Sequence, residues 1–157
     1  MLIQNYGLFW HRDRVKWGKG RSRGTLEGYL KSAKRQSTTD FRDQRGIYVL
    51  YDDTFRIVYV GHAGRRNQCL FQRLKQHKTD HLAERWSRFS WFGTRGVTKK
   101  CELADDKDFK PSLVDVLNHI EAILIATAEP PLNLQRGRFG SKVEQYLQRE
   151  ESSAGIR

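Results

Sequence analysis

A carboxylate stands in the middle of the most apolar helix that this sequence predicts. Residues 113–128 contain so few polar side chains that the helix should be buried, and Glu121 lies halfway along it. A buried carboxylate has to be paired, hydrogen-bonded, protonated or bound to a metal ion. Two interpretations stay open from the helix alone: an ion pair with one of the arginines, or a metal-ligating or catalytic carboxylate.

Four other side chains of chemically useful types lie in the middle of the chain. Arg73 and His77 are four residues apart in a predicted helix over 68–78, so both face the same side and indicate a shared site. Tyr48 and Tyr59 lie in two β-rich segments, where a tyrosine taken singly is usually a filler of core or surface.

The elements that would position these residues form a hairpin followed by a helix. Runs of β-branched, aromatic and leucine residues predict strands at 46–51, 56–60 and 89–97. A turn at 52–54 makes the first two an antiparallel hairpin, and a glycine-containing loop over 61–67 leads into the helix over 68–78. Asp80 is expected to cap a short helix over 81–86.

The flanking segments carry weaker signals. The N-terminal part predicts a strand or hairpin at 8–17, a short helix over 25–34 with Thr25 as its N-cap, and a polar linker over 36–45. Capping boxes at Ser112–Asp115 and Ser141–Glu144 predict the starts of the helix over 113–128 and of a terminal helix over about 141–150. Pro130-Pro131 ends the first of these helices.

Charge and composition point to a polyanion as the partner. The 157 residues carry 29 Lys and Arg against 18 Asp and Glu, a formal net charge of +11. Residues 1–45 hold 11 basic and 4 acidic side chains, 46–97 hold 9 and 4, and 98–157 hold 9 and 10. The positive charge therefore belongs to the first two thirds, where bases alternate with Phe9, Trp10 and Trp17. A solvated basic face over a packed core is the alternative interpretation.

Several classes of protein are disfavoured. No apolar run reaches the roughly 18 residues of a membrane span, and the first residues lack the pattern of a signal peptide. Cys69 and Cys101 cannot form a disulfide framework, and no cysteine–histidine ladder suggests structural zinc. We expect an intracellular, cytoplasmic protein without a membrane partner.

The hairpin carries a known signature. Gly46-Ile47-Tyr48, with Tyr59-Val60-Gly61 after ten intervening residues, resembles the motif of the GIY-YIG nuclease family, with Val60 for the middle isoleucine. Arg73, Glu121 and Asn133 follow in the order of the family's arginine, metal-binding glutamate and asparagine, and His77 resembles a histidine of some members. The resemblance covers about residues 44–135.

This resemblance implies a fold and a division of the chain. The fold would be a small α/β domain of the α+β type, with a central three-stranded antiparallel sheet flanked by helices. The nuclease domain would span 44–135, with a charged insert at 98–111. A basic N-terminal extension over 1–43 could pack on its core, and a C-terminal helix and tail would occupy 136–157.

The resemblance also implies a reaction and roles. Such a protein is a metal-dependent endonuclease that cleaves phosphodiester bonds with one Mg²⁺ (or Mn²⁺), which Glu121 would hold. Arg73 would contact the scissile phosphate, and Tyr48 would position or deprotonate the water. Tyr59 would orient the phosphate or water, and His77 would polarise Tyr48 or contact phosphate. Gly46, Gly61 and Asn133 would support the site.

DNA is the expected substrate, in restriction, phage defence or a mobile element, and RNA is the other nucleic acid to consider. Residues expected to bind its backbone are Arg12, Arg14, Lys16, Lys19, Arg21, Arg23, His62, Arg65, Arg66, Lys75 and Lys78. The alternatives are a non-catalytic nucleic-acid-binding module on the same fold, an RNA- or structure-specific nuclease, and a scaffold that meets an acidic protein. A single metal site would cut one strand, so a double-strand break would need a dimer or two nicks.

Overall fold

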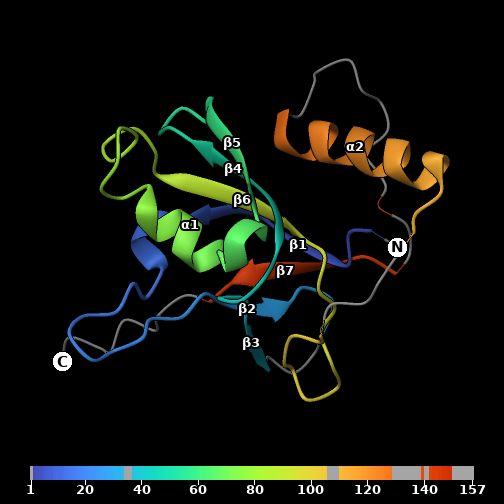
Figure 1. Ribbon diagram of the computed structural model, residues 1–157, viewed down its shortest axis with the longest axis horizontal. Coiled ribbons are helices and arrows are strands. Elements are labelled where there is room, and N and C mark those ends of the chain that lie inside the picture. The colour runs from blue at the N-terminus through green and yellow to red at the C-terminus, as the bar shows by residue number, and fades with distance from the viewer. Residues whose placement is uncertain (1, 34–36, 106–109, 129–138, 140–141, 150–157) are drawn as a thin grey trace.

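The protein is built on one mixed β-sheet of seven strands in the order β3-β2-β7-β1-β6-β4-β5 (Figure 1). The computed structural model describes residues 2–33, 37–105, 110–128, 139 and 142–149. The strands are β1 Asn5–His11, β2 Glu27–Leu30, β3 Thr38–Asp40, β4 Gly46–Tyr51, β5 Ile57–Ala63, β6 Arg88–Gly93 and β7 Glu144–Gln148. The helices of the described residues are α1 Leu70–Gln76 and α2 Leu113–Ala128, with short 3₁₀ turns η1 Arg12–Arg14 and η2 Arg65–Asn67.

The expected small three-stranded sheet flanked by helices is wrong. Strands β5, β4 and β6 do form an antiparallel group, but β1 pairs with the other edge of β6, and β7, β2 and β3 continue the sheet. The reason lies in β6, where Phe89, Trp91 and Phe92 are all fully buried on its two faces. A strand so apolar on both faces has to be central, because an exposed edge of this kind would aggregate.

Two expected helices are strands. The 25–34 segment contains β2, and the 141–150 segment contains β7, which lies between β1 and β2. Gly28 pairs with Thr39 of β3 and with Gln148 of β7. A Cβ on Gly28 would lie 2.7 Å from the Trp10 ring carbon Cη2, so the indole leaves no space for a side chain there. Pairing between residues far apart in sequence outweighs the local cap signals.

Other sequence expectations are confirmed. The hairpin forms as β4 and β5, and the helix over 68–78 contains α1. Ser112 opens α2, since its Oγ accepts a hydrogen bond from the Asp115 amide at 3.1 Å. The segment 81–86, by contrast, forms turns, although Asp80 does accept a hydrogen bond from the Leu82 amide at 2.8 Å.

The two helices cover opposite faces of the sheet. The face that includes Tyr48 and Trp91 packs against the buried side chains of α1, Leu70, Phe71 and Leu74. The neighbours Ile47 and Phe92 point the other way and pack with Ala122 and Ile123 of α2. Figure 1 shows α1 lying across the sheet near β6, and α2 lying well apart from α1.

Helix α2 is not buried all round as its composition predicted. Its buried residues are His119, Ala122, Ile123 and Thr127, whereas Leu113 is 73%, Leu117 56% and Leu124 60% exposed. One flank therefore meets the sheet, and the apolar side chains on the other flank face outward. No helix of the described residues is long and apolar enough to cross a membrane.

Candidate active site

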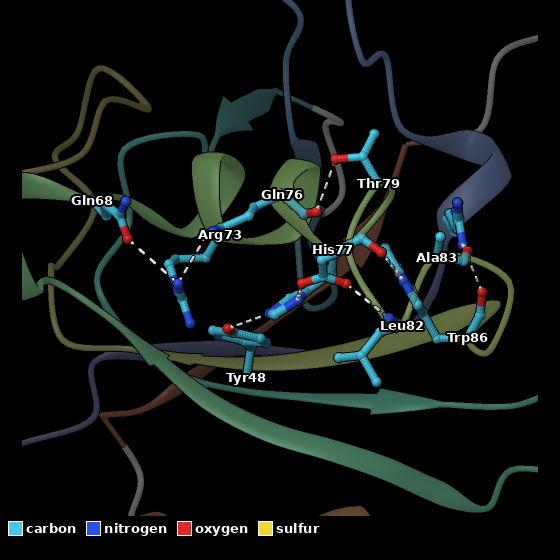
Figure 2. A network of polar contacts seen from close by, with 11 residues as sticks. Tyr48, Gln68, Arg73, Gln76, His77, Thr79, Leu82, Ala83 and Trp86 are labelled. Carbon is cyan, nitrogen blue, oxygen red and sulfur yellow. Dashed lines mark hydrogen bonds and ion pairs between the residues drawn. The ribbon is translucent and has the colours of Figure 1, made fainter.

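A buried chain of hydrogen bonds joins the sheet to helix α1. The Tyr48 hydroxyl lies 2.8 Å from Nε2 of His77, and Nδ1 of His77 lies 2.7 Å from a carboxylate oxygen of Asp80. Tyr48 is fully buried, His77 is 3% exposed, and the Asp80 side chain is 27% exposed. Figure 2 shows His77 and Arg73 reaching down from the helix toward Tyr48 on the strand below. The sequence expectation that Arg73 and His77 share one side of a helix is confirmed.

The two glycines of the hairpin signature make room for this arrangement. Gly61 pairs with Tyr48 across β4 and β5, and a Cβ on Gly61 would lie 2.5 Å from the phenol carbon Cζ. Gly46 has a φ of +140°, and a Cβ there would collide with the Phe92 carbonyl. Both glycines are therefore required by close approach of other atoms.

Gly61→Ala should lower the free energy of unfolding by about 1–3 kcal/mol, because the added methyl group overlaps the Tyr48 ring. Urea unfolding followed by tryptophan fluorescence would measure this. Gly96→Ala is the matched control, since its Cβ would have only ordinary contact with Gln4, at 3.8 Å. Equal stabilities of the two variants would contradict the tight contact at Gly61.

Helix α1 is anchored at both ends beside the site. The Cys69 side chain and Gln72 form a capping box at its start, with the Cys69 amide donating to Gln72 Oε1 at 3.0 Å. At its end the Trp86 indole N–H donates to the His77 carbonyl at 3.0 Å. These contacts hold the imidazole of His77 in place over Tyr48.

Arg73 lies beside Tyr48, and not all of its N–H groups form hydrogen bonds. Its Nη1 donates to Gln76 Oε1 at 2.9 Å, and more weakly to Gln68 Oε1 at 3.4 Å. Its Nε is buried and has no hydrogen-bond partner. No carboxylate of the described residues pairs with this guanidinium. An arginine without a counter-charge is suited to bind an anion.

The pKa values of Tyr48, His77 and Asp80 define where the protons of these hydrogen bonds lie. Burial raises the pKa of Tyr48 to about 12, although the positive charge of Arg73 opposes this rise. Burial lowers the pKa of His77, and Asp80 only partly offsets that effect. Burial alone would raise the pKa of Asp80, but the hydrogen bonds from the Leu82 amide and His77 outweigh it and lower the pKa. At pH 7 the phenol and the imidazole are therefore neutral and the carboxylate is ionised.

These charge states fix the direction of both hydrogen bonds. An ionised carboxylate only accepts, so Nδ1 of His77 carries the hydrogen and donates it to Asp80. Nε2 is then the bare nitrogen of a neutral imidazole and accepts the Tyr48 hydroxyl. The chain can thus move a proton from the phenol to His77, where the Asp80 charge would stabilise the imidazolium.

Tyr59 completes the wall of the site. Its ring centroid lies 4.7 Å from that of His77 and 6.1 Å from that of Tyr48, and the side chain is half-buried. The four residues Tyr48, Tyr59, Arg73 and His77 are therefore brought together from β4, β5, α1 and the residue that ends α1.

Asp80 is a site residue that the sequence reading missed. The sequence predicts it only as the cap of a short helix, and one of its oxygens does accept a hydrogen bond from the Leu82 amide. The other oxygen holds His77, three residues earlier. The spacing of a histidine and an aspartate at i and i+3 was the available signal.

Glu121 is not brought together with these residues. It is exposed on α2, whose buried side chains pack on the sheet face opposite Tyr48. Within the described part of the chain no three His, Cys, Asp or Glu side chains gather in a way that could hold a metal ion. The carboxylate that the described residues place beside Tyr48 and His77 is that of Asp80, and Glu121 lies apart from it. Asn133 falls outside the described residues.

The expected nucleic-acid-binding residues are spread over several surfaces. Arg12 is half-buried, and its guanidinium donates to the carbonyls of Ala83 and Trp86. His62 is exposed and pairs with Ile47, which places it on the α2 face. Lys78 is half-buried, and Arg65 lies in η2. The remaining exposed ones are Arg14, Lys16, Lys19, Arg21, Arg23, Arg66 and Lys75. Of these, Arg23 forms an ion pair with Asp43 at 3.4 Å.

Comparison with known proteins returns no relative. No protein-family model matches the chain, and no curated protein or solved structure matches it either.

Proposed function

We propose that this protein is an endonuclease that hydrolyses phosphodiester bonds in nucleic acid, with DNA as the first candidate substrate and RNA as the second. The observation that carries the proposal is the buried chain from Tyr48 through His77 to Asp80. Beside it lies the guanidinium of Arg73, which no carboxylate of the described residues neutralises. The net charge of +11 and the resemblance of the hairpin to the GIY-YIG signature support a polyanionic substrate.

The side chains supply the parts that hydrolysis needs. Arg73 binds the scissile phosphate and neutralises the charge that builds on its oxygens. A water attacks phosphorus and gives its proton to the Tyr48 oxygen, while the phenolic proton passes to Nε2 of His77. The bond from phosphorus to the leaving sugar oxygen breaks, and that oxygen takes a proton from solvent. Asp80 stabilises the imidazolium until His77 returns its proton.

No three metal-ligating side chains gather among the described residues, so no step of the reaction is assigned to the expected Mg²⁺. Cutting of supercoiled plasmid, single-stranded DNA and RNA should be compared in Mg²⁺, Mn²⁺ and EDTA, with Glu121→Gln beside the wild type. Loss of cutting both in EDTA and in Glu121→Gln would show that the reaction needs a metal ion and the Glu121 carboxylate. No cutting of any substrate would reject the proposed activity.

A non-catalytic nucleic-acid-binding module is the second candidate function. The observation that favours it is the complete burial of Tyr48, together with the rise of its pKa to about 12. Both fit a phenol that serves only to hold α1 on the sheet. Under this candidate, the protein would bind the same substrates with salt-sensitive affinity and cut none of them.

The acid limb of the pH–rate profile should report on His77 and depend on Asp80. Nε2 accepts a proton only when His77 is neutral, and burial lowers the pKa of His77 below its usual 6.5. The rate should therefore be constant above pH 6.5 and fall as the pH drops below it. Removing the Asp80 charge lowers that pKa further, so the fall should shift to lower pH in Asp80→Asn.

Asp80→Asn should also reduce cutting by about a hundredfold or more. Asparagine has one acceptor oxygen, and the Leu82 amide and Nδ1 of His77 both need one. If the oxygen serves Leu82, the amide N–H₂ faces His77 and forces the hydrogen onto Nε2, which can then no longer accept from Tyr48. Asp80→Glu, which keeps the charge and both acceptors, should retain more activity. Equal losses in the two variants would argue against this role.

A further inference from the structure

Helix α1 has a second flank that gathers positive charge away from Tyr48. Phe71, Lys75 and Lys78 follow at i, i+4 and i+7, so they lie on one side of α1 and of the turn after it. Arg73 and His77 lie on the other side, over the hairpin. The second flank meets the N-terminal segment, where the ring centroids of Trp17 and Phe71 are 5.5 Å apart.

The cations on this flank are held against aromatic rings. Lys78 Nζ lies 4.6 Å from the centroid of the Trp17 ring, and the Arg12 guanidinium lies 4.5 Å from that of Trp86. Lys75 Nζ lies 5.9 Å from the Phe71 centroid. Trp17 itself is fixed, because its indole N–H donates to the Arg12 carbonyl at 3.1 Å. A cation over a ring keeps its charge and loses some of its freedom.

These like charges lie close together without a counter-charge. Burial, followed by the positive charges of Arg12 and Lys75, lowers the pKa of Lys78. Among the described residues no carboxylate pairs with Arg12, Lys75 or Lys78. Elsewhere the fold does form such pairs, for example Arg149 with Glu27 at 2.6 Å. Arg12 does donate to the carbonyls of Ala83 and Trp86, but carbonyls do not neutralise its charge. Holding the three positive charges together is therefore unfavourable until an anion binds among them.

We infer that Arg12, Lys75 and Lys78 form a second phosphate-binding site, which takes a backbone phosphate of the nucleic-acid strand away from the bond that is cut. Lysine ammonium groups bind phosphate as mobile point charges, and ring contact pre-orders two of the three cations. That the phosphate belongs to a nucleic acid rests on the proposed function.

The position of the site relative to Tyr48 gives the course of the strand. The two flanks are separated by the width of one helix, about 10 Å. The strand would therefore leave the active site and pass around the end of α1 toward Trp17.

The test is the salt dependence of binding by a variant that removes both lysine charges. Lys75→Gln/Lys78→Gln and the wild type would be titrated against a fluorescently labelled single-stranded 12-mer in EDTA, between 50 and 300 mM NaCl. The slope of log K against log salt should fall in magnitude by about 0.7–1.4, for one or two phosphates lost. Affinity at the lowest salt should fall about tenfold.

A matched control removes the same charge elsewhere. Lys99→Gln/Lys100→Gln neutralises two exposed lysines of the turn after β6 and should leave the slope unchanged. Lys78→Arg keeps a cation over Trp17 and should bind like the wild type. An unchanged slope in the Lys75/Lys78 variant, or an equal change in the control, would overturn the inference. The inference would also be overturned if the Lys75/Lys78 variant lost binding to phosphatidylserine vesicles but kept its affinity for the 12-mer. That pattern would indicate that these lysines bind a membrane surface.

The readout separates this inference from the proposed activity. Binding in EDTA needs no cutting, so a protein that never cuts can still show the slope change, and only the proposed function would then fail. If the protein cuts, the Lys75/Lys78 variant should have a raised KM and a nearly unchanged kcat. Thermal unfolding at the wild-type temperature would show that the variant is folded.

Discussion

Tyr48→Phe should reduce cutting by about a thousandfold while leaving substrate binding nearly intact. The phenyl ring fills the same fully buried place, so the variant removes one hydroxyl and little volume. Without it, the attacking water has no group through which to pass its proton to His77, and general acid–base contributions of this kind are worth about 10²–10⁴-fold. Single-turnover cleavage of a labelled duplex would measure the loss.

Loss of the hydroxyl also affects stability, and a control separates the two effects. Tyr48→Phe leaves Nε2 of His77 buried without its partner, which should lower the free energy of unfolding by about 1–3 kcal/mol. Tyr51→Phe removes another fully buried hydroxyl of the same strand, one that donates to Ser90 Oγ at 3.1 Å. It should lose similar stability and keep its activity. Full activity in Tyr48→Phe would exclude the hydroxyl from the reaction.

Arg73→Ala should reduce cutting by about 10²–10³-fold, through loss of the charge that stabilises the phosphate in the transition state. The effect should appear mainly in kcat, because the developing charge is greatest after the substrate is bound. Arg73→Lys should recover only part of the rate, since an ammonium cannot reproduce two parallel N–H donors from one planar group.

The control for Arg73 is another arginine near the same helix. Arg85 is exposed in the turns between α1 and β6, so Arg85→Ala removes the same charge from outside the site. It should weaken binding slightly and leave kcat unchanged. If Arg85→Ala and Arg73→Ala lose activity equally, the loss reflects general charge, and the placement of Arg73 over Tyr48 carries no special role.

The parts of the site that lie close in sequence could be predicted from it. The hairpin of β4 and β5 follows from two β-rich runs with a turn between them, and it places Tyr48 and Tyr59 on adjacent strands. The i, i+4 spacing of Arg73 and His77 placed both on one flank of α1. Each of these inferences needs only the periodicity of one element and its neighbour.

The parts of the fold that depend on pairing between residues far apart in sequence could not be predicted. Glu144 lies in a strand because residues 144–146 pair with residues 5–7 of β1, and its capping-box pattern with Ser141 says nothing about a partner so far away. Glu121 was expected to be buried because its helix is apolar, but burial depends on how much of the sheet is available to cover it. The sheet covers one flank of α2 and leaves the carboxylate exposed.

The place of β7 in the sheet has a consequence for how the protein is made. Strands β2 and β3 pair with each other, and among the described residues β7 is the one strand that joins them to the rest of the sheet. During synthesis, the pair of strands β2 and β3 cannot join the sheet through β7 until the chain has been synthesised through Gln148. The final docking therefore closes a very long loop, a step that is slow in folding. We expect a chain truncated before Glu144 to keep the hairpin of β4 and β5 and helix α1, but to lack the strand with which β2 pairs in the sheet.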